Sequence, residues 1–359
     1  MNTHVELGRE LIHLSEYDLP NLKSFQEEIL SVRKLYFIDN KVYYRCNTCN
    51  WSEDNPRNNY HTSRQRRDAV GTLLTTFEAG DEPEYILSTY LFYYTQRKLS
   101  DQKDAINAMA GILRRISDRL QCSELAGMPM AHFDFWLLFT SFGPSLGRRN
   151  YFPSYSWAGW ITSINYLFNR FEDSIANTWI IWYVRNSDGT TTLIQNPQPG
   201  KRGVDQSIVE VLNLSKHSAT SASARETGPS GYFSTLRSDL PYDLLQFWTV
   251  SLHFSLRLIK DQYRRKSQIL DCFGRYRGEV LFDGEILTGM CEFVLLSKSI
   301  ELAKEFSIPT ISSGNDLYFV MLILWKKGIA ERRGLGQIRQ CAIEHSFPPG
   351  PVWKEIVLG

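Results

Sequence analysis

The spacing of apolar and polar residues changes along the chain, from helical periods to runs typical of strands. Between residues 21 and 34, apolar residues recur every three or four positions, which predicts a short amphipathic helix. Two aromatic-rich runs, 35–38 and 42–46, flank a two-residue polar turn and predict a β-hairpin. Residues 51–68 are polar and contain a proline, which is typical of a surface loop.

A second helical pattern extends from residue 84 to residue 121. Tyrosine and leucine side chains share one broad face of a first helix, and Ser100-Asp101 follows it. Aspartate is a favoured N-cap, so we expect one continuous second helix over residues 101–120, with an apolar stripe along it. Residues 133–139 are almost wholly apolar and predict another buried segment, too short to assign to helix or strand.

After Gly147 the apolar residues occur in short β-branched or aromatic runs. Asp188-Gly189 and Asp283-Gly284 are dipeptides typical of hairpin turns between strands. The second half is therefore predicted to be an antiparallel β-rich region. The runs cover residues 179–184, 190–194, 247–256, 279–282, 293–296 and 317–325.

These patterns predict an α+β protein with three stretches of different character. Residues 1–20 have little pattern, and residues 21–146 form a helical N-terminal third that includes the aromatic hairpin. Residues 147–359 form the antiparallel β-rich half, which is interrupted near 196–230 by a segment rich in Pro, Gly and Ser. That composition is typical of a linker or a long excursion between strands.

Composition excludes several classes of protein. The 359 residues are 43% hydrophobic and 13% aromatic, which is incompatible with a largely disordered chain. The 40 basic and 39 acidic residues leave a net charge of +1, which argues against nucleic acid or an anionic membrane as a partner. The most apolar stretch, 317–325, is far shorter than the roughly twenty residues of a membrane helix. Six scattered cysteines favour reduced thiols and a cytoplasmic location.

The pair Cys46 and Cys49 is the sharpest local motif for metal chemistry. Two thiolates at this spacing can chelate zinc, but a structural zinc site needs two further ligands. His61 alone lies near in the sequence. We therefore interpret the motif as an ordinary strand end with two reduced thiols, and expect neither a metal nor a cofactor.

The other candidate motifs have simpler structural explanations. Asp101 and Asp104 lie in the first turn of the predicted helix, where a helix favours negative charge, and Glu27 and Glu28 point apart on theirs. The glycines between 328 and 336 are interpreted as turns between strands, because no phosphate-binding spacing is present. The basic clusters at 64–67 and 264–266 are interpreted as solvated loops.

Residues 152–160 carry the most distinctive pattern in the chain. Trp157 and Trp160 lie among serine, alanine and glycine, and small residues allow a large ring to lie across a neighbouring strand. Each indole N–H must then find an acceptor, so the segment is predicted to be a structural motif. The alternative is a ligand-stacking or catalytic site with Arg148 and Arg149 nearby.

Several motifs, in order along the chain, also resemble those of fungal heterokaryon-incompatibility (HET domain) proteins. The similarity covers about residues 21–359 and concerns the region downstream of the HET core. Its motifs include Leu30-Ser31-Val32-Arg33, Tyr94-Thr95-Gln96-Arg97, Ala108-Met109-Ala110-Gly111-Ile112 and the Trp-rich segment. The motif residues, to which we assign structural roles, are Phe25, Gln26, Glu27, Arg33, Cys46, Arg97, Pro153, Trp157, Trp160, Trp325 and Trp353.

The chain departs from the family pattern at informative places. Lys23 and Tyr155 stand where the family has tryptophan, and residues 1–20 do not resemble it. The family also has an upstream HET core, similar to TIR domains, some of which hydrolyse NAD with a glutamate. No position in this chain matches that core, so no catalytic residue is carried over from the resemblance.

The resemblance implies a non-enzymatic regulatory or scaffold region of a HET-type protein, acting in fungal non-self recognition and programmed cell death. Its expected partner is another protein or a HET core. Two alternatives stay open: an enzyme with its own site, such as an NAD hydrolase, and a zinc-dependent nucleic-acid-binding module. If a partner normally covers part of the chain, we expect an exposed apolar patch near Phe25, Leu35 or Phe37.

Overall fold

A computed structural model describes most of the chain, in two compact units. One unit comprises residues 1–82 and 107–115, and the other comprises residues 83–106 and 116–359. The predicted excursion at 196–230 and the basic cluster at 64–67 lie outside the described residues. Those described are 3–7, 10–14, 25–31, 33–38, 40–46, 49–53, 60–61, 82–143, 145, 147–168, 170–194, 240–259, 265–301, 303, 306 and 316–359.

The first unit contains two antiparallel sheets and a short helix. Strands β1 (Thr3–Leu7) and β2 (Glu10–Leu14) form a hairpin within the segment that lacks a sequence pattern. The predicted aromatic hairpin is confirmed as β3 (Arg33–Ile38) and β4 (Lys41–Cys46). β5 (Cys49–Ser52) and β6 (Tyr60–His61) extend this sheet in the order β3-β4-β5-β6. Residues 51–68 are therefore not loop throughout.

The predicted helix over residues 21–34 is shorter than its apolar period suggests. Helix α1 spans Phe25–Leu30 and buries Phe25 and Ile29, which are 3% and 5% exposed. The helix cannot continue to residue 34, because Arg33 already belongs to β3 and pairs with Cys46. Phe25 and Ile29 are therefore buried as an amphipathic helix requires, but the predicted helix end was wrong.

Helices α2 (Pro83–Thr95) and α3 (Ala110–Leu120) follow, and the second differs from its prediction. Asp101 is an N-cap as expected, because its carboxylate accepts a hydrogen bond from the Lys103 N–H at 2.9 Å. It caps only the 3₁₀ turn η1 (Gln102–Asp104), and a second turn, η2 (Asn107–Met109), precedes α3. The continuous helix over 101–120 is therefore wrong, although most of the apolar stripe is buried and only Ile106 and Leu120 are half-buried.

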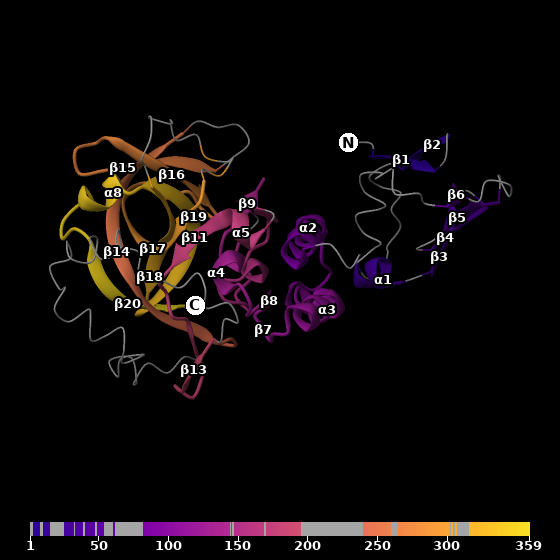
Figure 1. Cartoon of the computed structure of the whole chain (residues 1–359), viewed down its shortest axis with the longest axis horizontal. Helices are drawn as coiled ribbons and strands as arrows, with labels where there is room; N and C mark the ends of the chain where they lie inside the picture. Colours follow the sequence, from indigo (N-terminus) through magenta and orange to yellow (C-terminus); the bar gives the residue numbers. More distant parts are fainter. Residues whose placement is uncertain are drawn as a thin grey trace. The chain divides into compact units, whose positions relative to one another are not determined.

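Six long strands of the second unit close into a ring, which we call the closed sheet (Figure 1). The pairing runs β14–β17–β18–β19–β16–β15 and returns to β14, and every pair is antiparallel. This confirms the antiparallel β-rich C-terminal half. The strands are β14 (Leu244–Leu258), β15 (Lys266–Leu270), β16 (Tyr276–Phe282), β17 (Gly289–Ser299), β18 (Leu317–Lys326) and β19 (Ile329–Arg339).

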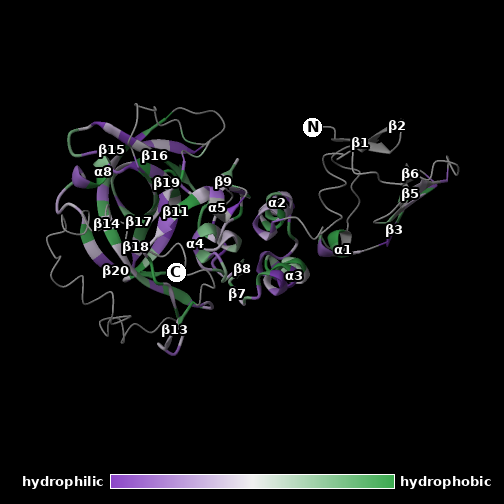
Figure 2. Ribbon diagram, in the orientation of Figure 1, coloured by the Kyte–Doolittle hydropathy of each residue, from purple (hydrophilic) through white to green (hydrophobic). Residues whose placement is uncertain are grey.

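The last strand, β20 (Val352–Leu358), lies along the first half of β14, and the short helix α8 (Cys341–Glu344) precedes it. Apolar side chains alternate toward the inside of the closed sheet, including Val250, Leu252 and Phe254 of β14, which are fully buried. Figure 2 shows hydrophobic and hydrophilic positions interspersed along these strands. This alternation is what an antiparallel sheet with one buried face requires.

Glycines allow β16 and β19 to approach closely. A Cβ added at Gly278 would lie 2.2 Å from the Gln337 carbonyl oxygen, and one at Gly334 would lie 2.4 Å from that of Leu281. Gly334 therefore lies within a strand, where the sequence analysis predicted a turn. Only the turn at Gly328, between β18 and β19, matches that prediction.

Shorter elements join the helices to the closed sheet. Residues 133–139 are buried as predicted and contain α4 (Phe133–Trp136) and the start of β9 (Phe139–Phe142). Asp188-Gly189 forms the predicted hairpin turn between β12 (Tyr183–Arg185) and β13 (Thr191–Leu193). The remaining elements are β7 (Glu124–Leu125), β8 (Met128–Pro129), η3 (Trp157–Gly159), β10 (Ser163–Tyr166), α5 (Phe171–Ser174) and β11 (Ile175–Thr178).

The predicted strand at 179–184 is largely absent, since only its last two residues belong to β12. Its aromatic residues pack instead: Trp182 contacts Phe247, with ring centroids 4.4 Å apart. Within the described part of the chain, none of the helices has the length and apolar character needed to cross a membrane.

Candidate functional site

The Trp-rich loop, residues 148–160, is closed at its base by main-chain hydrogen bonds. Arg148 and Trp160 form an isolated antiparallel bridge, and the Arg149 N–H donates to the Gly159 carbonyl at 2.9 Å. Inside the loop, the Ser156 hydroxyl caps η3 by accepting from the Ala158 N–H at 3.0 Å. Short polar residues thus fold the loop locally, which explains why its character could be recognised from the sequence.

The two tryptophans of this loop are fully buried, and each indole N–H has an internal acceptor. Trp157 donates to the Gly127 carbonyl at 2.8 Å, and Trp160 donates to the Ser154 carbonyl at 2.9 Å. Gly284 leaves room for Trp160, because a Cβ there would lie 2.8 Å from the ring. The prediction that each indole N–H finds an acceptor is confirmed for both tryptophans.

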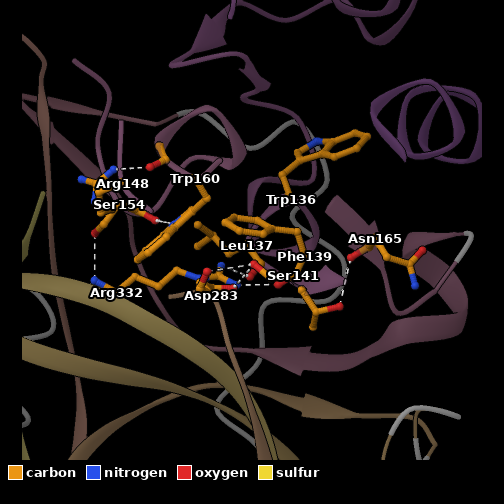
Figure 3. A network of polar contacts seen from close by, with 12 residues as sticks. Trp136, Leu137, Phe139, Ser141, Arg148, Ser154, Trp160, Asn165, Asp283 and Arg332 are labelled. Carbon is orange, nitrogen blue, oxygen red and sulfur yellow. Dashed lines mark hydrogen bonds and ion pairs between the residues drawn. The ribbon is translucent and has the colours of Figure 1, made fainter. Parts of the chain in front are cut away.

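Below the loop lies a fully buried ion pair between β19 and the end of β16. Arg332 donates from Nε to the Asp283 carboxylate at 2.7 Å, and both side chains have no exposed surface. Its two remaining nitrogens donate to the carbonyls of Leu137, at 2.7 Å, and Phe139. The guanidinium carbon also lies 3.6 Å from the centroid of the Phe139 ring (Figure 3).

This ion pair corrects one of the sequence predictions. Asp283-Gly284 was expected to form a hairpin turn, but β16 pairs with β15 and β19, while β17 pairs with β11, β14 and β18. The dipeptide instead carries the chain from one strand to a non-adjacent one. Asp283 points inward to Arg332, and burial raises the pKa of its carboxyl above the ordinary value, against the opposing effect of the arginine.

Ser154 connects the loop to the ion pair. Its hydroxyl accepts from the Arg332 main-chain N–H at 2.8 Å and donates to the Gly359 carbonyl. The closed sheet, the C-terminal strand and the Trp-rich loop therefore meet at a single hydroxyl, which Figure 3 shows beside Trp160. This serine has no base within the network that could activate it as a nucleophile, because both of its hydrogen bonds are to main-chain groups.

The two arginines that begin the loop are also used internally. Arg148 donates from Nε to Glu331 at 3.1 Å and from Nη1 to the Gly159 carbonyl at 2.7 Å. Arg149 donates to the Gln102 side chain at 2.6 Å and to the Trp160 carbonyl. Burial lowers the pKa of Arg149. The arginines do lie beside the tryptophans, as the enzymatic alternative assumed, but their donors are directed to protein acceptors.

A second buried polar group surrounds α4. His132 precedes this helix and contacts the Glu84 carboxylate from α2, and both residues are buried. Asp134 accepts from Thr178 at 2.8 Å and from the Trp182 indole at 2.9 Å. None of these pairs was visible in the sequence, because the partners are 44 to 48 positions apart.

Trp325 belongs to a partly exposed cluster on the outer side of the closed sheet. Glu292 accepts from the Trp325 indole at 2.7 Å, from Lys354 at 2.8 Å and from the Ser251 hydroxyl at 2.7 Å. Burial alone would raise the pKa of Glu292, but these donors, Lys354 first, hold it below the ordinary value. His253 lies 3.9 Å from the same carboxylate. The serine bonds the acid and not the histidine, so the order of a catalytic triad is not present.

Two family motifs meet inside the first unit. The Gln26 side chain accepts a hydrogen bond from the Gly111 N–H at 2.9 Å, which satisfies one of the free donors at the start of α3. A Cβ at Gly111 would lie 2.7 Å from Cδ1 of Leu30, so a larger residue there would displace that leucine side chain. The sequence analysis named both residues but did not predict that they touch.

The other predicted motif residues are dispersed. Arg33 is exposed, Arg97 and Cys46 are half-buried, and Pro153 and Trp353 are buried. Trp353 stacks with Trp248, with ring centroids 6.3 Å apart. The side chain of Glu27 lies outside the described residues.

Cys46 ends β4 and Cys49 begins β5, so the motif occupies a strand-to-strand connection as predicted. Cys49 pairs in register with His61. Among the side chains that the structure describes, no three histidine, cysteine, aspartate or glutamate residues gather closely enough to hold a metal ion. The side chain of Cys49 is not among them.

No family model matches the sequence, and searches of curated proteins and of solved structures return no match either. The resemblance to HET-type proteins therefore stays a prediction, and the function must be argued from the geometry.

Proposed function

We propose that this chain is a non-enzymatic regulatory or scaffold region of a HET-type protein, which acts in the fungal cytoplasm in non-self recognition and programmed cell death. The observation that carries the proposal is the internal use of every distinctive polar group in the Trp-rich loop. Both indole donors, both arginines and Ser154 bond to the protein itself. A substrate would find neither a free donor nor an exposed ring on these residues.

A second observation supports a protein partner. Leu35 is 59% exposed and Phe37 is 76% exposed, on the strand where the sequence analysis expected an uncovered patch. Phe25, the third residue of that expectation, is buried. Exposed large apolar side chains that alternate along one strand face are typical of an interaction surface. In the proposed function, a protein partner or a HET core binds there. We also propose that helices are the main elements of the N-terminal third. In the structure that region contains both helices and strands.

The proposal is tested by expressing the chain in a fungal host and by incubating the purified protein with NAD. We expect normal growth, and no nicotinamide release above that of a buffer control. Cell killing by the chain alone, abolished by Glu84→Gln, would contradict a non-enzymatic role. Release of nicotinamide would instead support the enzymatic alternative. Zinc retained by the purified protein, and lost in Cys46→Ser, would support the metal-dependent module.

A further inference from the structure

Three basic side chains surround the carboxylate of Glu331, near the turn that joins β18 to β19. Arg148 donates from Nε to Oε1 at 3.1 Å, while Lys326 Nζ and Arg333 Nη2 each lie 2.6 Å from Oε2. Within the described part of the chain, these three cations form no ion pair with any other carboxylate. Three positive charges thus face one negative charge, although the whole chain has a net charge of only +1.

A β-bulge determines the position of Arg333. The pairing of β19 with β18 shifts register between Arg332 and Gly334, so Arg333 has no opposite residue on β18. A bulge leaves one residue outside the ladder and redirects its side chain, and bulges are frequent beside functional sites. The two consecutive arginines accordingly serve different carboxylates, because Arg332 pairs with Asp283 and Arg333 pairs with Glu331.

The guanidinium of Arg333 has donors that the protein leaves open. Its Nε is buried and has no hydrogen-bond partner, and Glu331 is the one polar contact of this guanidinium among the described residues. The side chain is 11% exposed and that of Lys326 is 57% exposed, so both cations can be approached from solvent. Buried polar groups normally have partners, and an unsatisfied one requires a specific explanation, such as a bound ion. Beside an excess of positive charge, that ion is an anion.

We propose that Arg333 and Lys326 form a binding site for a phosphate group, beside the carboxylate that Arg148 holds in place. A guanidinium donates two parallel charge-assisted hydrogen bonds to phosphate oxygens, and a lysine adds a point charge on a flexible stem. A phosphate monoester carries about −1.5 to −2 charges at pH 7, which matches the excess of two positive charges in this cluster. A carboxylate ligand would carry only one charge, so the site favours phosphate.

Glu331 limits the affinity of this site, because its carboxylate lies against the same two cations. Burial alone would raise the pKa of Glu331, but Lys326, Arg333 and Arg148 hold it below the ordinary value. The carboxylate therefore stays charged at neutral pH and repels the phosphate. Glu331→Gln removes this charge, so it should tighten phosphate binding. A role of the cluster in stability alone would not produce that gain.

The inference does not depend on the proposed function and is tested by calorimetric titration of the full chain with inorganic phosphate. Low ionic strength is used, because salt screens exposed charges. We expect one saturable site with a dissociation constant of about 1 mM or tighter. Arg333→Gln should raise this constant about tenfold and the more exposed Lys326→Gln about threefold, while Glu331→Gln should lower it. Arg257→Gln, at an exposed arginine of β14 outside the cluster, is the matched control and should leave it unchanged.

Two further probes define the ligand. Acetate should bind more weakly than phosphate, because it carries a single charge. A phosphoserine peptide and its unphosphorylated form distinguish the source of the phosphate group. Tighter binding of the phosphopeptide than of inorganic phosphate would assign the site to a phosphorylated protein, and equal or weaker binding would assign it to a small phosphate compound. Both results support the phosphate site.

Four results would overturn the inference. They are the absence of saturable phosphate binding, an unchanged affinity in both Arg333→Gln and Lys326→Gln, an equal loss in Arg257→Gln, and acetate binding as tight as that of phosphate. Tryptophan fluorescence of each variant establishes that it is folded. Lys326→Gln keeps the test decisive if Arg333→Gln does not fold, since the lysine side chain is mostly exposed.

Discussion

The Trp-rich loop and the β3–β4 hairpin differ in which kind of side chain they bury and which kind they expose. Around the loop, polar and charged groups are buried and are paired within the chain, some of them with distant partners, as Arg332 is with Asp283. On the hairpin, apolar groups are exposed, with Phe37 more exposed than any other large hydrophobic side chain that the structure describes. The polar groups of the loop are thus satisfied within the chain, whereas the apolar side chains of the hairpin are exposed and available to another molecule.

The buried ion pair and the exposed apolar face also bear on different properties of the protein. A buried ion pair is weak evidence for stability by itself, since its desolvation cost offsets much of the attraction. It is strong evidence for a fixed arrangement, because either partner alone is costly to bury. An exposed apolar face contributes little to the stability of the unit that carries it, and its value lies in what it binds.

The largest effect is expected from Arg332→Met. The substitution leaves the Asp283 carboxylate buried without its cation and leaves the carbonyls of Leu137 and Phe139 without a donor. Breaking a buried pair in this way typically costs about 3–5 kcal/mol of unfolding free energy. Urea denaturation followed by tryptophan fluorescence measures the loss.

The double variant Arg332→Met, Asp283→Leu is the control for this prediction. It removes the uncompensated charge, so at least half of the lost stability should return. A cost below about 1 kcal/mol for Arg332→Met would mean that the ion pair does not hold the loop against the closed sheet. If the single variant does not fold, an osmolyte that favours the compact state extends the measurable range.

The next effect is expected from Gly284→Ala. A Cβ at this position lies 2.8 Å from Cζ3 of Trp160, so the ring or the main chain must move. Overpacking of this kind typically costs about 1–3 kcal/mol. Thermal or urea denaturation measures the change, and the same substitution in a Trp160→Phe background provides the control.

Phenylalanine lacks the second ring, so the two substitutions should couple: Gly284→Ala should cost less in the Trp160→Phe background than in the native chain. Equal costs in both backgrounds would show that the glycine is needed for a reason other than the tryptophan.

The local and long-range parts of this site differ in how far the sequence could predict them. The need of Trp157 and Trp160 for acceptors and small neighbours follows from residue chemistry alone, and the structure contains both. The partnership of Arg332 with Asp283 depends on two strands that are not adjacent in sequence. The Asp-Gly dipeptide even indicated the wrong local structure there, because its turn propensity does not reveal which strands it joins.

The same limit explains the helix errors. The apolar period over residues 101–120 reports which side chains are buried, and burial can be met by two 3₁₀ turns and a shorter helix as well as by one long helix. At α1, the pairing of Arg33 with Cys46 competes with the last turn of the helix. The sequence pattern therefore identified burial more reliably than it identified backbone conformation.

A smaller effect is expected from pH at the outer cluster of Glu292. The pKa of this carboxyl is lower in the folded chain than its ordinary value of about 4.3. Its contribution to stability is therefore present above that pH, and it is lost as pH falls through the folded pKa. Glu292→Gln should reduce the fall in stability below pH 4.5, by less than about 1 kcal/mol because the lysine partner is partly exposed.

Urea denaturation at a series of pH values, for the native chain and for Glu292→Gln, measures this difference. Glu301→Gln, at an exposed position beyond β17 and outside this cluster, serves as the comparison and should leave the pH profile unchanged. Identical profiles for the native chain and Glu292→Gln would show that the cluster does not hold its charge in the folded state.

The smallest effect is expected on the exposed face of the hairpin. Phe37→Ser removes a ring that is 76% exposed, so at protein concentrations where the chain is monomeric the unfolding free energy should change by no more than about 0.5 kcal/mol. Phe25→Ser is the matched change in the same unit, at a ring that is 3% exposed, and should cost at least about 3 kcal/mol. Hydrogen exchange of the hairpin and of α1 reports on both variants. Equal losses of unfolding free energy in the two variants would mean that the Phe37 ring is packed against this chain. The hairpin would then not present an exposed apolar face, and the contrast with the buried loop would not hold.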